Sequence, residues 1–154
     1  DKAVESLLWD MGRWLMKRQI QDSPYPDVIG GFRRGKDGNE LPSYEGGIYL
    51  RALVALQPLA QQRGQTELAH ALTEAISKGR AFLDRLQHTA ARSFHLTHPE
   101  RFRGAYRFAL TLNNVRIDYV YHDGGAIATC LLGPEATAPT PTNDDKGEDQ
   151  PQIP

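Results

Sequence analysis

The segment from Arg116 to Asp123 holds the densest group of side chains that could transfer protons. If the segment is helical, Asp118 and His122 lie four residues apart on the same face. The acid would then orient the imidazole and raise its basicity, while Tyr121 would supply a second proton carrier. This arrangement suits proton abstraction. An ordinary helical pair explains the same residues more simply, because acids are common near helix starts.

Two matched pairs of charged residues extend this candidate site. Arg33 and Arg107 each follow a glycine-aromatic turn, where an arginine either binds an anionic ligand or bonds to the carbonyl end of a helix. Glu45 and Asp123 each precede Gly-Gly. Two such acids form the carboxylate pair of a glycosidase when they face one cleft, and otherwise they stabilise the positive ends of helix dipoles. The sequence leaves both interpretations open for each pair.

Other kinds of chemistry are weakly represented. His95 and His98 have a metal-like spacing but no convincing third ligand, so no metal site is predicted. Gly30-Gly31 lacks the strand and helix that a dinucleotide or phosphate loop requires, and we expect no cofactor. Cys130 is the only cysteine and lies in an apolar run. It excludes an intramolecular disulfide and is interpreted as a buried structural thiol.

Composition limits the class of partner. The chain has 154 residues, of which 40% are hydrophobic, enough for one domain with a real core. Lys and Arg total 18 against 19 Asp and Glu, so no overall field draws the chain to nucleic acid or to an anionic membrane. No run approaches the roughly 20 apolar residues that a membrane span needs. We therefore expect no nucleic-acid partner and no membrane span.

Hydrophobic periodicity predicts four helices, over about residues 2–21, 43–63, 66–87 and 113–133. Ser43 is expected to cap the second helix, Pro58 to kink or break it near its end, and Asn113 or Asn114 to cap the fourth. A brief strand is expected within residues 105–112, and a helical turn from Pro99. The helical domain then covers residues 1–133. Residues 134–154 are rich in Pro, Thr and acids, which predicts a flexible acidic tail.

The first helix has an apolar stripe that should face the core. The stripe is formed by apolar residues that recur at helical spacing: Val4, Leu7, Leu8, Met11, Trp14 and Leu15. Trp9 lies off this stripe. We therefore expect Trp14 to be part of the core and Trp9 to be the freer tryptophan, available for stacking on a sugar.

The chain also repeats one order of features. The order has three features: a Gly-Arg sequence in a helix end, a glycine-aromatic-arginine turn, and an acid before Gly-Gly. They occur first in residues 12–19, 30–33 and 44–47, and then in the same order in residues 79–87, 104–107 and 122–125. Repetition at a spacing of roughly 65 to 80 residues predicts that one helix-loop-helix unit is used twice. The two units should then have equivalent turns, so their matched arginines and acids are explained first by the fold.

This layout resembles that of the α/α-toroid proteins, which include terpenoid-cyclase-like domains, six-hairpin glycosidases, and several polysaccharide lyases and epimerases. The resemblance covers about residues 3–132. It implies an all-α fold in which two repeated helix-loop-helix units form an antiparallel helical bundle or a partial α/α toroid. The aspartate-rich motif of protonating cyclases and the Cys, His and Asp set of zinc prenyltransferases are missing, so both of those chemistries are disfavoured.

The resemblance implies a carbohydrate-handling module of the cell envelope, periplasmic or secreted, that acts on or binds an acidic polysaccharide. In the lyases and epimerases an acid and a base act on a uronate while a cation neutralises its carboxylate. The residues expected to do so are His122, Asp118, Tyr121 and Glu45 for catalysis, and Arg33, Arg107 and Trp9 for binding. The alternative is a non-catalytic protein-interaction or assembly module, because four helices are too few for a closed toroid. Such a module would bind a protein partner or associate with itself.

Overall fold

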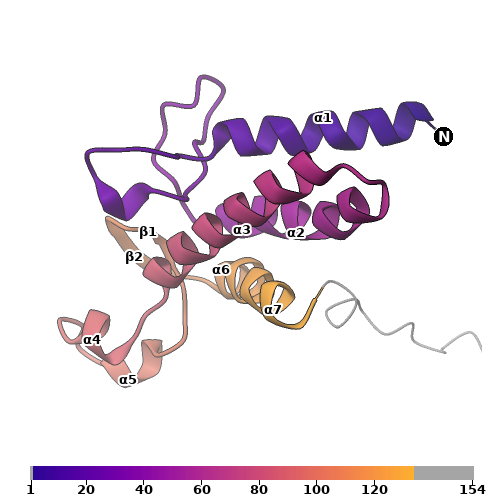
Figure 1. Cartoon of the computed structure of the whole chain (residues 1–154). Coiled ribbons are helices and arrows are strands. Elements are labelled where there is room, and N and C mark those ends of the chain that lie inside the picture. Colours follow the sequence, from indigo (N-terminus) through magenta and orange to yellow (C-terminus); the bar gives the residue numbers. More distant parts are fainter. Residues whose placement is uncertain (1, 134–154) are drawn as a thin grey trace, which may run out of the picture.

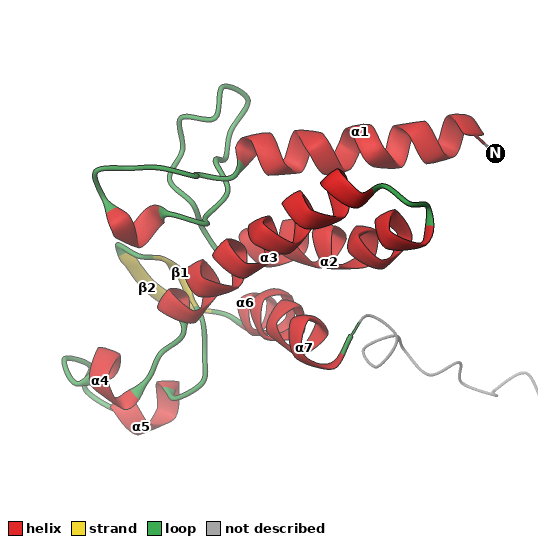
Figure 2. Ribbon diagram, in the orientation of Figure 1, coloured by secondary structure: helices red, strands yellow, loops and turns green. Residues whose placement is uncertain are grey.

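The computed structural model describes residues 2–133, a mostly helical chain with one small β-hairpin (Figures 1 and 2). Its long helices are α1 (Lys2–Arg18), α2 (Gly46–Gln62), α3 (Thr66–Leu86) and α7 (Gly125–Leu132). The shorter elements are η1 (Pro26–Val28), α4 (Ala90–Ser93), α5 (Pro99–Phe102), β1 (Arg107–Ala109), β2 (Leu112–Val115), α6 (Ile117–Tyr119) and the π-helical segment η2 (Val120–Gly124). The all-α prediction is therefore correct for the main elements. The predicted tail lies outside the described residues.

Helices α2 and α3 form the centre of the molecule. A turn at Gly64, whose positive φ of 67° suits glycine, reverses the chain between them. Leu50 and Leu53 of α2 and Leu72 of α3 are completely buried in the apolar core. Helix α7 packs against α2 and α3, and α1 packs against α2, as Figure 1 shows. Burial of these side chains is the main source of stability, because it removes apolar area from water.

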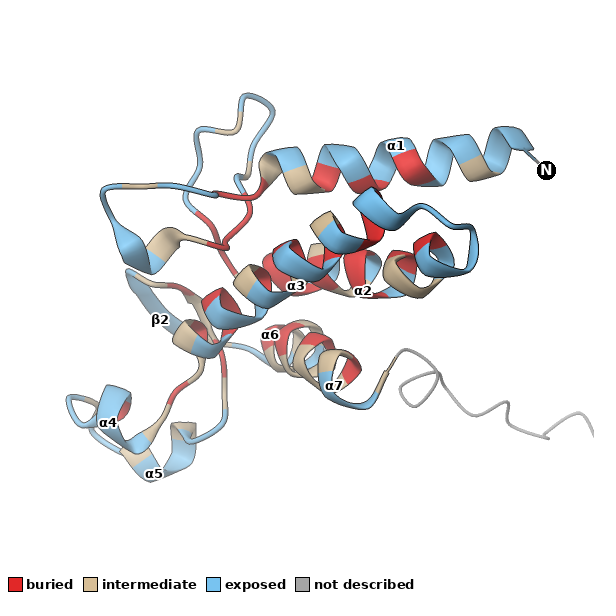
Figure 3. Cartoon of the chain, in the orientation of Figure 1, coloured by how far each residue is buried: buried red, intermediate tan, exposed pale blue. Residues whose placement is uncertain are grey.

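Helix α1 packs with a face that overlaps its predicted apolar stripe only in part: Leu15 is buried, whereas most of the other stripe residues are exposed. Trp9 is buried at 8% exposure, whereas Trp14 is 52% exposed, so the expected roles of the two tryptophans were the wrong way round. Gly12 allows the close approach: a Cβ atom at this position would lie 2.9 Å from Leu56 Cδ1. In Figure 3 most of the α1 surface is therefore exposed.

The start of the predicted fourth helix was also wrong. Asn113 and Asn114 lie in β2, and helical structure begins only at Ile117. The predicted strand exists as β1, which pairs antiparallel with β2. Helix α2 begins at Gly46, and Ser43 accepts a 3.4 Å hydrogen bond from the Glu45 N–H rather than from a helical N–H.

Two loops of the chain close with the same backbone bonds. After α1, the Ile20 N–H donates a hydrogen bond to the Gly31 carbonyl at 2.8 Å. The Ile20 carbonyl accepts one from the Gly30 N–H at 2.9 Å. After α3, the His88 N–H donates in the same way to the Ala105 carbonyl at 2.8 Å, and the His88 carbonyl accepts from the Gly104 N–H at 2.9 Å. Isolated antiparallel bridges flank both sets, Gln19 with Phe32 and Gln87 with Tyr106.

Candidate functional site

Three aromatic rings meet where the turn before α2, strand β1 and helix α6 come together. Tyr44 lies 4.1 Å from Tyr119 and 5.5 Å from Phe108 between ring centroids, and Phe108 lies 5.7 Å from Tyr119. The Tyr44 N–H donates a 2.9 Å hydrogen bond to the Phe108 carbonyl, which fixes the turn against the strand. Burial is the main cause that raises the pKa of Tyr44. These rings form an apolar base for the charged side chains around them.

Arginine side chains and further rings continue this base toward solvent. The guanidinium carbon of Arg116 lies 5.7 Å from the Tyr119 ring, and that of Arg51 lies 5.7 Å from the Tyr121 ring. His122 is 6.2 Å from Tyr44 and 5.2 Å from Tyr121 between ring centroids. We call the surface formed by Tyr44, Arg51, Arg116, Tyr121 and His122 the aromatic-arginine face. It offers ring surfaces and cationic groups side by side.

Glu45 is held in an ion pair with Arg34. Its carboxylate accepts two hydrogen bonds from the Arg34 guanidinium, at 2.7 Å and 3.1 Å. The hydrogen bond to Glu45 is the largest cause that raises the pKa of Arg34. Arg34 also lies 5.3 Å from the Phe108 ring and 3.6 Å from Glu40. The bidentate geometry fixes the turn that carries Tyr44.

Asp118 and His122 do not form the predicted pair. Asp118 accepts a hydrogen bond from Arg116 at 3.0 Å, and no hydrogen bond or ion pair joins it to His122 within residues 2–133. Each side chain has another partner: Asp118 is bonded to Arg116, and the His122 ring lies near the rings of Tyr44 and Tyr121. The acid-base arrangement expected from an α-helix is therefore absent here.

Asp123 is completely buried, and within the described residues neither of its carboxylate oxygens accepts a hydrogen bond of ordinary geometry. Burial raises its pKa from an ordinary 3.8 to about 8, an effect that the nearby Gly47 N–H reduces. The carboxyl group is therefore mostly protonated at neutral pH. A Cβ atom at position 47 would lie 2.5 Å from Asp123 Oδ1, so glycine is needed where α2 meets η2. Asp123 does not serve as an exposed partner for Glu45.

Arg107 closes the end of helix α3. Its guanidinium donates a 2.8 Å hydrogen bond to the Arg85 carbonyl, which is the structural one of its two predicted roles. Burial is the largest cause that lowers the pKa of Arg107. Burial, and next the charge of Arg107, also lower the pKa of His88, whose Nδ1 lies 3.2 Å from the Ser93 hydroxyl. These groups stabilise the loop after α3.

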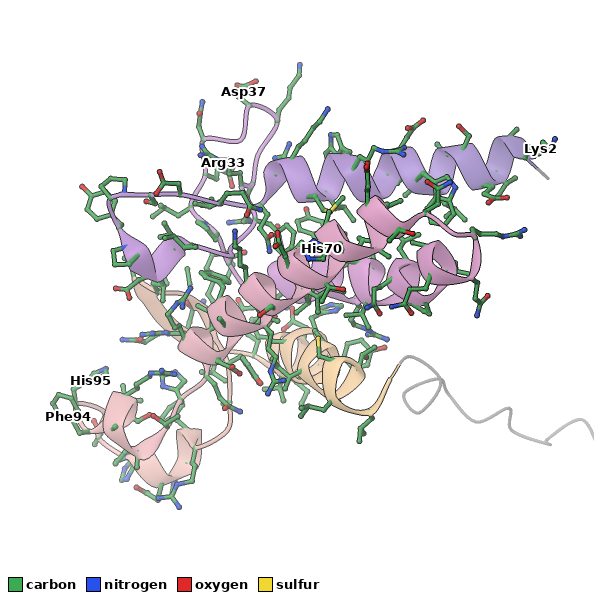
Figure 4. All side chains as sticks on the ribbon, viewed as in Figure 1. Lys2, Arg33, Asp37, His70, Phe94 and His95 are labelled. Carbon is green, nitrogen blue, oxygen red and sulfur yellow. The ribbon has the colours of Figure 1, made fainter. Side chains whose placement is uncertain are left out.

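Among the described residues, no ring contact joins Arg33 or Trp9 to the aromatic-arginine face. Figure 4 shows Arg33 and Asp37 in a loop at the top of the view, and Phe94 and His95 in a separate loop at the bottom left. The contact between the end of α1 and this loop is made by the other arginine: the Arg18 side chain donates a hydrogen bond to the Arg33 carbonyl at 3.0 Å. Because Trp9 is buried, its ring is not available for stacking on a sugar.

Sequence reasoning missed Arg51 and gave Tyr44 no role. A usable signal was present for Arg51, because it is the one charged residue within the sequence of α2. A lone arginine in an apolar helix needs a reason for its place, such as a ring or an anion beside it. Tyr44 gave no comparable signal, since its partners come from β1 and α6, far along the chain.

The described part of the chain contains no cluster of three or more His, Cys, Asp or Glu that could hold a metal ion. His98 lies 3.6 Å from Glu100, and His95 lies 3.4 Å from the Asn113 amide. No helix within residues 2–133 is long and apolar enough to cross a bilayer, in agreement with the sequence. Comparisons with protein-family models, curated proteins and solved structures gave no match to this chain.

Proposed function

We propose that the chain consists of two copies of one helical unit, α1 with α2 and α3 with α7, arranged as part of an α/α toroid. The matched backbone bonds of Ile20 and His88 support this, because they place the same loop after α1 and α3. The Gly-Gly sequences at the start of α2 and α7 support it further, since Gly47 lets α2 approach η2 closely and Gly125 lies beside the Arg51 side chain of α2. The two helices would be the inner helices of their units.

For the function, we propose that the aromatic-arginine face binds an acidic polysaccharide without chemical turnover. Arg51 carries this proposal. It is half-buried, stacks on a Tyr121 ring that is 64% exposed, and has no ion pair within residues 2–133. An exposed ring can pack against the apolar face of a sugar, while the guanidinium binds its carboxylate in a bidentate geometry.

Binding fits the site better than catalysis because its acids are already engaged. Glu45 is paired with Arg34, and Asp118 with Arg116. Asp123 is buried and mostly neutral at pH 7. A lyase or glycosidase needs a carboxylate or a base that can reach the substrate. Of the predicted catalytic residues, His122 and Tyr121 remain accessible on this face, without a free carboxylate beside them in the described residues.

The test is calorimetric titration of the full chain with a polyuronate, and with neutral dextran as the uncharged comparison. We expect Arg51→Ala and Tyr121→Ala each to weaken polyuronate binding by about tenfold or more, because each removes a contact contributing at least about 1.4 kcal/mol. Arg13→Ala, an exposed arginine on α1, is the matched control and should bind as the original chain does. Equal affinity of the Arg51→Ala and Arg13→Ala variants, or no binding of any polyuronate, refutes the proposal.

A second candidate is the non-catalytic assembly module. The observation that favours it is the apolar stripe of α1, whose residues Val4, Leu7, Met11 and Trp14 are each more than half exposed. A contiguous apolar surface of this kind on a small domain is typical of a protein interface. This function and polysaccharide binding use different surfaces, so one chain can have both.

A further inference from the structure

An apolar groove runs between α1 and α2. It has a volume of about 620 Å³. Its lining consists of Leu7, Asp10, Met11, Trp14 and Leu15 of α1 and Ile48, Tyr49 and Ala52 of α2. The α1 residues are mostly exposed, and Ile48 is 44% exposed. The walls are almost entirely apolar, so water in the groove is unfavourable and a second apolar surface would displace it.

The proposed two-unit repeat shows what fills the equivalent groove of the second unit. There the groove lies between α3 and α7, and α2 packs against both helices. Counting back from Gln19 and Gln87, which make matched bridges, aligns the α1 stripe with residues of α3. Val4, Leu7, Met11 and Trp14 then correspond to Leu72, Ala75, Gly79 and Phe82. All four α3 residues are buried.

The other end of the array has the complementary surface. Aligning Gly46-Gly47 with Gly124-Gly125 matches Leu53 and Val54 of α2 with Leu131 and Leu132 of α7. The two α2 residues are buried in the core that α2 forms with α3. The two α7 residues are 59% and 67% exposed. Helix α7 therefore presents the same kind of face that α2 uses, with nothing covering it in the described structure.

We propose that α7 of one copy of this chain packs into the α1-α2 groove of a second copy, as α2 packs between α3 and α7 within one copy. The side-chain sizes support this pairing. Within the chain, Leu50 faces Gly79, where a Cβ atom would lie 3.0 Å from Leu50 Cδ1. Across the copies the corresponding pair is Ala128 of α7 and Met11 of α1. The large side chain is then on the groove helix and the small one on the inserted helix, and the summed volume of the two side chains is similar.

The proposed contact is head to tail, because it joins two different surfaces. Such a contact leaves a free groove at one end and a free α7 at the other, so copies add until a ring closes or a filament grows. Each added copy would bury the same apolar faces again, as in repeat proteins. The inference rests on the proposed two-unit repeat, and it does not depend on polysaccharide binding.

Complementary variants of the full chain test the proposal by light scattering after gel filtration, across a concentration series. The original chain is expected to form species larger than a monomer as its concentration rises. Met11→Glu blocks the groove and Leu131→Glu blocks the α7 face, so each variant alone should be monomeric. Mixed in equal amounts, they should form a dimer, since each retains the surface that the other has lost. Ser6→Glu, an exposed position on α1, is the control and should assemble as the original chain does.

Each other result overturns the proposal. If Leu131→Glu still associates while Met11→Glu does not, two α1 faces pair with each other. If the original chain stays monomeric, the groove has another occupant or none, whereas polyuronate binding can still be measured separately on that monomer. Circular dichroism of both variants verifies that they are folded. A conservative pair, Met11→Ala and Leu131→Ala, should weaken association in the same pattern if a glutamate prevents folding.

Discussion

The buried carboxyl group of Asp123 should make the folded protein less stable as the pH rises, and Asp123→Asn tests this. Its pKa is about 8 in the folded chain, against an ordinary 3.8. Below about pH 4 the group is protonated in both the folded and the unfolded chain. Between about pH 4 and pH 8 the unfolded chain releases the proton while the folded chain keeps it, so the free energy of unfolding falls through this range.

The size of the effect follows from the two pKa values. One pKa unit corresponds to about 1.4 kcal/mol. Between about pH 5 and pH 7.5 the folded chain binds nearly one more proton at Asp123 than the unfolded chain, and this difference summed over the range amounts to a little over two pH units. The original chain should therefore lose about 3 kcal/mol of stability over this range because of Asp123 alone. That is a large part of the roughly 5–15 kcal/mol of a typical domain.

The measurement is urea unfolding of the original chain and of Asp123→Asn at several pH values. Asparagine has nearly the shape of a protonated aspartate but does not titrate, so other ionisable groups cancel in the comparison. Its amide has its own burial cost of about 1–3 kcal/mol, which does not depend on pH. The difference in pH slope is therefore the quantity to compare. Asp37→Asn, in an exposed loop, is the control that should keep the original slope. Equal slopes for the original chain and Asp123→Asn would refute the assigned burial.

Three further predictions follow from single contacts. Gly47→Ala would place a Cβ atom 2.7 Å from a carbonyl oxygen of η2, and should destabilise the fold by roughly 2 kcal/mol or more, seen as a lower Tm; an unchanged Tm contradicts the close helix approach. Glu45→Gln should cost about 1 kcal/mol by weakening the partly exposed ion pair with Arg34, and a double-mutant cycle with Arg34→Met should reveal their coupling; additive effects would contradict it. With Trp9→Phe, the remaining Trp14 fluorescence of dilute protein should be readily quenched by acrylamide, whereas Trp14→Phe should leave a protected signal; equal quenching would contradict the observed burial of these residues.

Local signals were sufficient for the central hairpin. The third predicted helix, residues 66–87, agrees with α3 almost residue for residue, because its apolar stripe is clean and Gly64 ends the helix before it. The helical turn at Pro99 is confirmed as α5. Pro58 lies within α2, which continues to Gln62 beyond it. The start of the fourth helix failed, because Asn113 and Asn114 are used in a strand whose partner is β1.

The candidate site was less accessible to sequence reasoning. Asp118 and His122 are four residues apart, but Asp118 is bonded to Arg116 and His122 lies against the rings of Tyr44 and Tyr121, and spacing alone does not reveal these competing partners. The partners of Glu45 and Tyr44 come from the preceding loop, from β1 and from α6. Such contacts depend on how the loops fold back on the helices.

The sequence by itself determined which segments are helical and which positions in them are apolar, because helix periodicity and turn residues act between neighbours in the chain. Only the tertiary structure decided which apolar side is covered. Helix α1 has apolar residues around more of its surface than the core covers, and the side with Trp9, Gly12 and Leu15 is buried while Trp14 is left exposed. In the same way, Asp123 is buried because Gly47 lets α2 approach η2. Its proton affinity is set by that packing, which no local pattern contains.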